Sequence, residues 1–83
     1  MDEGFEWDEL KTRENYAKHG VSFETATRIF EDPFAIERLD DREDYGEDRF
    51  ILTGSAEGVL LTIVYTERNG RIRLISARRR NEA

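Results

Sequence analysis

The chain has 83 residues, of which 37% are hydrophobic and 39% are charged, so we expect one domain, residues 1–83, built around one small core. It contains no cysteine, which excludes disulfides and thiolate metal sites and favours a cytoplasmic protein. Its formal net charge of −6 argues, for the chain as a whole, against a nucleic-acid ligand.

The first twenty residues are expected to form a short strand and a helix. The acidic start, Met1-Asp2-Glu3-Gly4, lacks the apolar segment of a signal peptide. Phe5–Trp7 alternates like a strand, and Asp8 is a good N-cap for a helix that runs from about residue 9 to residue 19. Gly20 suits the end of this helix, whose thin apolar stripe consists of Leu10, Tyr16 and Ala17.

A second helix is expected directly after the first. Ser22 is a suitable N-cap, and an apolar face recurs at helical spacing in Phe23, Ala26, Ile29 and Phe30. Asp32-Pro33 ends this helix, because the residue before a proline is disfavoured in the helical region.

The rest of the chain is typical of an antiparallel sheet. Charged residues 40–48 predict a loop, residues 54–58 a turn, and Asn69-Gly70 a tight hairpin. The expected strands are Phe34–Leu39, Arg49–Thr53, Val59–Tyr65 and Arg71–Ala77. The sequence therefore predicts an α+β fold in which two N-terminal helices pack on an antiparallel sheet, with a short N-terminal strand. The longest apolar run, residues 59–65, is too short to span a bilayer, so we expect no membrane contact.

Charge is unevenly distributed along the chain. Residues 1–65 contain seven Lys and Arg against seventeen Asp and Glu, whereas residues 66–83 contain six Arg and two Glu, a net charge of +4. All six cations of the second segment are arginines, whose planar guanidinium pairs bidentately with phosphate. This asymmetry is the first indication of an anionic ligand such as RNA.

Arginines from neighbouring strands are candidates for one phosphate-binding surface. Strands in a sheet lie about 4.8 Å apart, so Arg49, Arg68, Arg73 and Arg78 can converge on one phosphate or on successive phosphates. Arg79 and Arg80 extend the candidate substrate-binding set. Two other interpretations stay open: the arginines solvate an exposed face, or they form a non-catalytic module that binds an acidic or amphipathic partner.

Several enzyme designs are excluded by residue type. The chain has one histidine, His19, and no nucleotide-binding glycine motif, and the acidic loop lacks the spacing of a calcium site, so no metal or cofactor is expected. RNA cleavage needs neither, because the neighbouring 2′-OH attacks the phosphate while fixed cations stabilise the charge that develops. His19 is a candidate acid–base group or a helix cap, and Tyr65, Thr66 and Ser76 supply hydroxyls.

Several motifs together resemble the BrnT family of type II toxins. They are Phe5-Glu6-Trp7-Asp8, Asn15, Lys18-His19-Gly20-Val21-Ser22-Phe23-Glu24, Asp32-Pro33, Gly46-Glu47-Asp48-Arg49, Thr66-Glu67-Arg68 and Arg73-Leu74-Ile75-Ser76-Ala77-Arg78. The resemblance implies a RelE-like ribonuclease fold, metal-independent cleavage of RNA and neutralisation by a BrnA-type antitoxin. It further implies that the toxin–antitoxin complex represses its own operon, so DNA is contacted only through the antitoxin. A homodimer and a 2:2 complex both remain open.

The resemblance also assigns roles to individual residues. Arg68 and Arg78 would bind the scissile phosphate, Arg49 would support them, and Thr66 or Ser76 would orient a phosphate oxygen. His19 and Tyr65 are further catalytic candidates. Relatives often carry a histidine where Tyr65 stands, and they continue past the Ser-Ala-Arg block with a basic helix. If that helix contacts RNA, weaker activity is expected of this chain.

Overall fold

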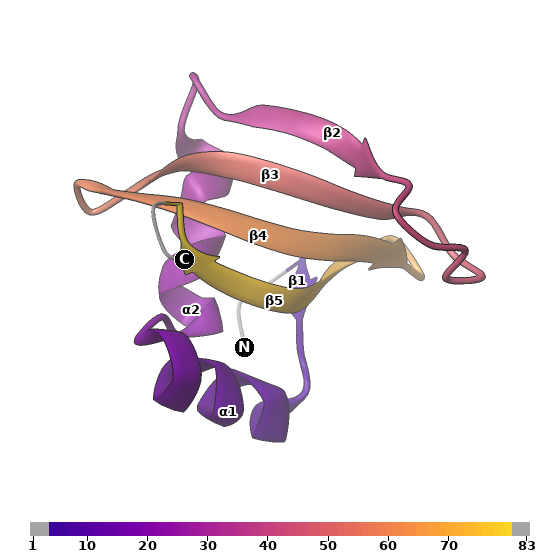
Figure 1. The fold of residues 1–83 in the computed structure, drawn as a ribbon, viewed down its shortest axis with the longest axis horizontal. Helices are drawn as coiled ribbons and strands as arrows, with labels where there is room; N and C mark the ends of the chain where they lie inside the picture. Colours follow the sequence, from indigo (N-terminus) through magenta and orange to yellow (C-terminus); the bar gives the residue numbers. More distant parts are fainter. Residues whose placement is uncertain (1–3, 81–83) are drawn as a thin grey trace.

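A computed structural model describes residues 4–80 and shows an α+β fold, as predicted (Figure 1). Met1–Glu3, in the acidic start, and Asn81–Ala83 lie outside the described residues. In chain order the elements are β1 (Phe5–Glu6), α1 (Glu9–His19), α2 (Phe23–Ala26), the 3₁₀-helix η1 (Thr27–Glu31), β2 (Ile36–Asp40), β3 (Arg49–Ala56), β4 (Val59–Arg68) and β5 (Arg71–Arg79).

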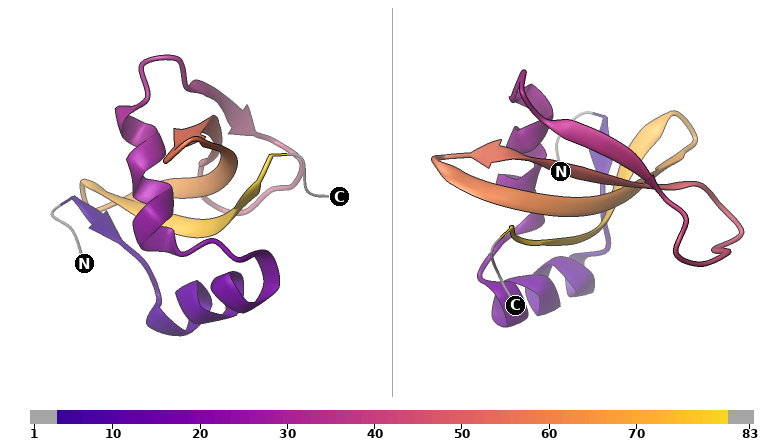
Figure 2. Two further views of the ribbon diagram at one scale, coloured as in Figure 1. Left: turned by 90° about the vertical axis from the view of Figure 1, so that its left-hand side faces the viewer. Right: turned by 45° about the horizontal axis from the view of Figure 1, so that its top comes forward.

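The strands form one five-stranded sheet in the order β1-β5-β4-β3-β2. Strands β2 to β5 pair antiparallel, as predicted, but β1 pairs parallel with β5, so the sheet is mixed. The helices follow β1 rather than preceding the whole sheet, because the N-terminal strand joins the sheet edge before the chain turns into α1. Figure 2 shows α2 and η1 against one face of the sheet and α1 beside β5.

Helix α1 has the predicted ends but not the predicted buried stripe. The Asp8 carboxylate accepts hydrogen bonds from the backbone N–H groups of Leu10 and Lys11, and Gly20 ends the helix with a φ of 72°. Leu10 and Tyr16 are exposed, and the buried residue of α1 is Asn15. The prediction of an apolar stripe was wrong, since α1 is attached to β5 by a polar side chain.

The second helix carries the main apolar contact with the sheet. The Ser22 hydroxyl caps its N-terminus, and the α-helix tightens into 3₁₀ geometry after Ala26 before ending ahead of Pro33. Phe23, Ala26 and Ile29 are fully buried, which confirms the predicted face. No helix among residues 4–80 is long and apolar enough to cross a membrane.

The sheet has two faces with different chemistry, because side chains alternate along a strand and direct cross-strand partners point to the same side. On the helix face, residues of β3, β4 and β5 pack against α2 and η1: Leu52, Leu61, Ile63, Tyr65, Leu74 and Ala77. We call the opposite side the open face. It carries Arg38, Arg49, Ile51, Thr62, Val64, Thr66, Arg73, Ser76 and Arg78.

Strand β3 extends further than the sequence predicted. Gly54, expected in a turn, lies within the strand, and the turn consists of Glu57 and Gly58 alone, with φ values of 51° and 80°. Gly54 is required by close packing: a Cβ atom there would lie 3.0 Å from the Cβ of Ala35 and 3.2 Å from an Asp32 carboxylate oxygen. A glycine that indicated a turn in the sequence thus permits a close approach between β3 and the segment after η1.

The Gly54→Ala variant is expected to lower the free energy of unfolding by about 1–3 kcal/mol, because an added methyl group in a tightly packed site forces its neighbours to shift. Urea denaturation measures the change. Ser55→Ala, at the exposed neighbouring position, is the control and is expected to stay within about 0.5 kcal/mol of wild type. Equal stability of the two variants would contradict the packing role of Gly54.

Candidate active site

One end of the open face carries a row of arginines. Arg49, Thr66 and Arg73 are direct partners across β3, β4 and β5, and Arg68 pairs with Arg71 beside them. We call Arg49, Arg68, Arg71 and Arg73 the arginine row. Three of the four arginines expected to converge, Arg49, Arg68 and Arg73, line one depression together with Thr66.

Glu47, from the acidic loop, holds two members of the row. One carboxylate oxygen lies 3.1 Å from Nη2 of Arg68 and the other 3.2 Å from Nε of Arg49. These hydrogen bonds, first from Arg68 and then from Arg49, lower the pKa of Glu47. The guanidinium of Arg49 also lies 4.1 Å from the centre of the Tyr45 ring, a cation–π contact.

Glu6 holds the other two members. Its carboxylate lies 3.2 Å from Nε of Arg71 and 2.9 Å from Nη1 of Arg73, and Arg71 also donates to the backbone carbonyl of Phe5 at 2.8 Å. All four arginines of the row therefore have a carboxylate partner within the protein. Two carboxylates serve four guanidinium groups, so about half of the positive charge of the row is balanced before any ligand arrives.

The side chain of Thr66 is buried and hydrogen-bonded within the protein. Its side chain is 2% exposed, and its hydroxyl donates to the backbone carbonyl of Asp48 at 2.6 Å. This bond fastens the acidic loop to β4, next to Arg49. The structure thus supports a role for Thr66 in positioning the loop that carries Glu47.

A second depression, of about 300 Å³, lies on the open face toward the C-terminal end of α1. We call it the Arg78 hollow. Its lining comes from α1, from strands β2 to β5 and from the start of the acidic loop: Lys18, His19, Arg38, Arg42, Ile51, Thr62, Val64, Ser76 and Arg78. Arg78, Ser76 and His19 were predicted site residues, and the fold brings them together here.

The hollow differs from the arginine row in its charge. Among residues 4–80, no carboxylate forms an ion pair with Lys18, Arg38 or Arg78. These cations come from three separate elements and line one concave surface, so their fields add at the same point. An anion bound in the hollow would therefore meet positive charge that no internal carboxylate neutralises.

Asp40 anchors the rim of the hollow. It is buried, and Arg42 binds it through two hydrogen bonds of 2.7 Å, while the Tyr45 hydroxyl donates to it at 3.2 Å. The hydrogen bond from Arg42 holds the pKa of the Asp40 carboxyl well below its usual range. Asp40 thus stays ionised and keeps Arg42 and the acidic loop in place.

Tyr65 lies away from both groups of arginines. It is in the core on the helix face, packed against the rings of Phe30 and Phe50, and its hydroxyl donates to the Glu37 carboxylate. Burial, and then the Glu37 carboxylate, raise the pKa of Tyr65. Tyr65 is therefore a core residue whose phenol stays protonated.

The raised pKa of Tyr65 predicts a stability change at alkaline pH. The folded state favours the neutral phenol, so this contribution is complete below the unfolded pKa near 10 and is lost as pH rises above that value. The free energy of unfolding of wild type, measured in urea, is expected to fall above pH ~10 by up to about 1.4 kcal/mol per pH unit more steeply than that of Tyr65→Phe. Identical slopes for the two proteins would contradict the assignment.

Arg79 and Arg80 do not join the open-face arginines. Arg79 follows Arg78 in β5 and points to the helix face, where its guanidinium lies beside Gly20. Arg80 comes after the end of β5, and its backbone N–H donates to the carbonyl of Leu60 at 2.8 Å. Neither residue lines the Arg78 hollow.

The family model for BrnT, the ribonuclease toxin of type II toxin–antitoxin systems, matches residues 7–83. The chain belongs to the BrnT family. A comparison with curated proteins gave no match. Membership of the BrnT family implies an RNA target and an antitoxin partner.

In this BrnT-family chain the predicted site residues separate into three groups. Arg49, Thr66, Arg68 and Arg73 form or support the row; His19, Ser76 and Arg78 line the hollow; Tyr65, Arg79 and Arg80 lie elsewhere. Sequence reasoning missed Lys18, Arg38 and Arg42 as lining residues. Lys18 was named only as part of a family motif, and no local pattern marks Arg38, since its place depends on the pairing of β2 with β3.

Proposed function

We propose that this chain is a toxin that cleaves RNA in the Arg78 hollow without a metal ion, on a RelE-like fold. The substrate class, RNA, follows from the family, which consists of ribonuclease toxins. The observation that carries the choice of site is the set of three cations in the hollow, Lys18, Arg38 and Arg78, that have no ion pair among residues 4–80. In the arginine row, by contrast, every guanidinium is already paired with Glu6 or Glu47, which balance half of its charge.

The proposed reaction is attack of a 2′-oxygen on the adjacent phosphorus. The P–O5′ bond breaks, leaving a 2′,3′-cyclic phosphate on one fragment and a 5′-hydroxyl on the other. The proton of the 2′-OH passes to a base, and a proton is delivered to the departing 5′-oxygen. Negative charge builds up on the phosphate oxygens in the transition state, and fixed cations there lower its energy.

Residues of the hollow take the roles that this chemistry needs. Arg78 in β5 and Arg38 in β2, with two strands between them, both line the depression and are suited to bind the nonbridging oxygens. His19, in the last turn of α1, is the acid–base candidate. Ser76 is suited to orient a phosphate oxygen. Tyr65 is left out of the mechanism because its hydroxyl is bonded to Glu37 on the other face.

The arginine row is assigned a supporting role. Arg49, Arg68 and Arg73 lie next to the hollow on the same face and hold the acidic loop and β1 through Glu47 and Glu6. They are suited to contact phosphates next to the scissile one. The positive charge that Glu6 and Glu47 leave on the row is enough for such contacts. Neutralisation is assigned to a BrnA-type antitoxin, whose complex with the toxin would contact operator DNA through the antitoxin.

Cleavage of a defined RNA by the purified, antitoxin-free chain tests the proposal. In EDTA we expect fragments that end in a 2′,3′-cyclic phosphate, and no cleavage at a linkage whose 2′-OH is methylated. Fragments with 5′-phosphates, or cleavage that needs a divalent cation, would contradict 2′-OH attack. Intact RNA after incubation with folded protein would favour a non-catalytic module that binds a partner through its arginines.

A further inference from the structure

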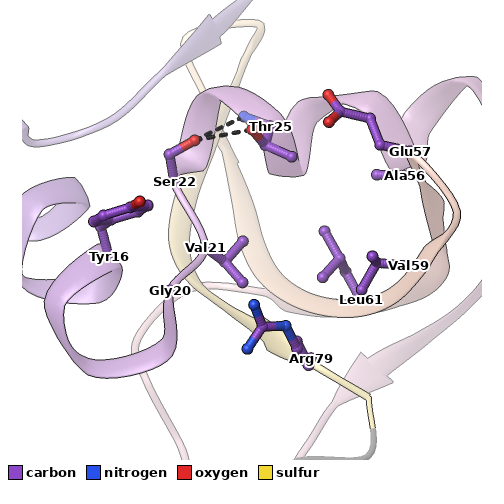
Figure 3. Close-up of a pocket in the computed structure, with 10 residues that line it drawn as sticks. All are labelled: Tyr16, Gly20, Val21, Ser22, Thr25, Ala56, Glu57, Val59, Leu61 and Arg79. Atoms are coloured by element: carbon purple, nitrogen blue, oxygen red, sulfur yellow. Dashed lines mark hydrogen bonds between the residues drawn. The ribbon is translucent and has the colours of Figure 1, made fainter.

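A cavity of about 160 Å³ lies on the helix face, away from the Arg78 hollow (Figure 3). It opens between the loop after α1, the start of α2 and the hairpin that joins β3 to β4. Apolar side chains, among them Val21, Val59 and Leu61, form most of its wall, and Arg79 lies at its edge. A cavity of roughly 150 Å³ holds a group the size of benzene. We call this cavity the Arg79 pocket.

Three polar side chains of the pocket, Ser22, Thr25 and Glu57, have partners within the protein. The Ser22 hydroxyl is bonded to the backbone N–H and the hydroxyl of Thr25, both at 3.1 Å (Figure 3). Glu57 forms an ion pair with Arg28 at 3.1 Å. Arg79 has no ion pair among residues 4–80 and is exposed. The polar partner that this pocket lacks is therefore an anion.

Exposed apolar residues continue the pocket onto the surface. Tyr16 is 61% exposed and Val59 is 42% exposed at its rim. Large apolar groups gathered in this way around a cavity are typical of a protein-binding surface. A single cation beside an apolar cavity fits one carboxylate next to one apolar side chain, whereas RNA needs several cations along its backbone.

We infer that the Arg79 pocket anchors the antitoxin, by taking up an apolar side chain while a neighbouring carboxylate of the antitoxin binds Arg79. The inference rests on the proposed function as a type II toxin. Consecutive residues of a strand point to opposite faces, so Arg78 serves RNA and Arg79 serves the antitoxin. The antitoxin is held at a site separate from the RNA site and blocks the hollow by extending past the β5 edge.

The two adjacent arginines provide a matched pair of variants. Binding of the antitoxin from the same operon is measured by calorimetry, and RNA cleavage is measured without antitoxin. We expect Arg79→Ala to weaken antitoxin binding at least tenfold and to cleave RNA at the wild-type rate within threefold. Arg78→Ala is expected to show the reverse pattern. Both side chains are exposed, so circular dichroism should show an unchanged fold.

A second variant tests the cavity itself. Val59→Glu puts a carboxylate at the rim, where it competes for Arg79 and repels an acidic partner, so antitoxin binding should weaken at least tenfold. Val59→Thr is the control, with an expected change under threefold. Wild-type affinity in both Arg79→Ala and Val59→Glu would overturn the inference. So would a wild-type dimer that Val59→Glu dissociates, since the pocket would then hold a second copy of the chain.

The result also separates this inference from the proposed function. If wild-type protein leaves RNA intact but Arg79→Ala still loses antitoxin affinity, the docking site stands and the nuclease proposal fails. If RNA is cut and only Arg78→Ala loses antitoxin affinity, the antitoxin covers the hollow directly and the docking inference fails.

Discussion

The Arg78→Ala variant is expected to cleave RNA at least about a hundredfold more slowly than wild type, because loss of one preorganised donor to a developing oxyanion typically costs a factor of 10²–10³. Arg78 lines the hollow and has no ion pair among residues 4–80, so its charge is available to the phosphate. The rate of cleavage of a short labelled RNA, with saturating enzyme and EDTA, measures the loss.

Lysine at this position tests what the guanidinium contributes. Arg78→Lys keeps the charge but loses the bidentate geometry, so we expect a rate between those of wild type and Arg78→Ala. Arg79→Ala, one residue away on the opposite face, is the matched control with an unchanged rate. A large loss in Arg68→Ala together with a wild-type rate in Arg78→Ala would move the site from the hollow to the arginine row.

The Asn15→Ala variant is expected to show the largest loss of stability among single changes to α1. Its Nδ2 donates to the carbonyls of Val21 at 2.9 Å and Ala77 at 2.7 Å, and its Oδ1 accepts from the Ala77 N–H at 3.2 Å. Strand β1 pairs only with Ile72 and Arg73, so the Asn15 amide replaces a strand partner further along the β5 edge.

Removing this amide leaves buried backbone groups without partners, at a cost of about 2–4 kcal/mol. Since 1 kcal/mol shifts the Tm of a domain of this size by about 4–8 °C, we expect thermal unfolding to show a decrease in Tm of about 8–32 °C. The exposed neighbour Glu14→Ala serves as control and should change the Tm by a few degrees at most. A decrease equal to that of the control would show that the β5 edge does not depend on Asn15.

The Asn15→Asp variant tests the same contacts through the pH dependence of stability. A carboxylate there would face two carbonyl oxygens, so folding would raise its pKa above the ordinary value near 4. The stability contributed by the protonated form is complete below that ordinary value and is lost as pH rises through the folded pKa. The loss of stability of the variant relative to wild type should therefore be larger at pH ~7 than at pH ~4.

Local sequence signals were sufficient to predict most of the secondary structure. The ends of α1 follow from Asp8 and Gly20, and the hairpin at Asn69-Gly70 has the two positive φ values, 55° and 74°, that its residues favour. Such features depend on a few consecutive residues, so the chain specifies them without reference to the rest of the fold. The strand ends were predicted less well: β3, β4 and β5 each end two or three residues later than expected, and β2 begins at Ile36 rather than Phe34. In β3 the reason is that Gly54 is required for packing against Asp32 and Ala35.

The division of the arginines between two faces depended on a distant irregularity. Strict alternation would put Arg73 and Arg78 on opposite faces of β5. A bulge between Val64 and Tyr65 shifts the pairing, so that Val64 faces Ser76 while Tyr65 faces Leu74, and both arginines reach the open face. No pattern within β5 marks this shift, since it depends on the fit between two strands.

By itself, the sequence determined that this chain is an α+β protein with a basic C-terminal segment, and its motifs indicated the BrnT family. Only the tertiary structure decided which cations share a surface and which are already paired with carboxylates. The reason is physical: caps, turns and alternation act over a few residues, whereas the ion pairs of Glu6 and Glu47 join side chains that are 67 and 21 positions apart, such as Glu6 with Arg73 and Glu47 with Arg68.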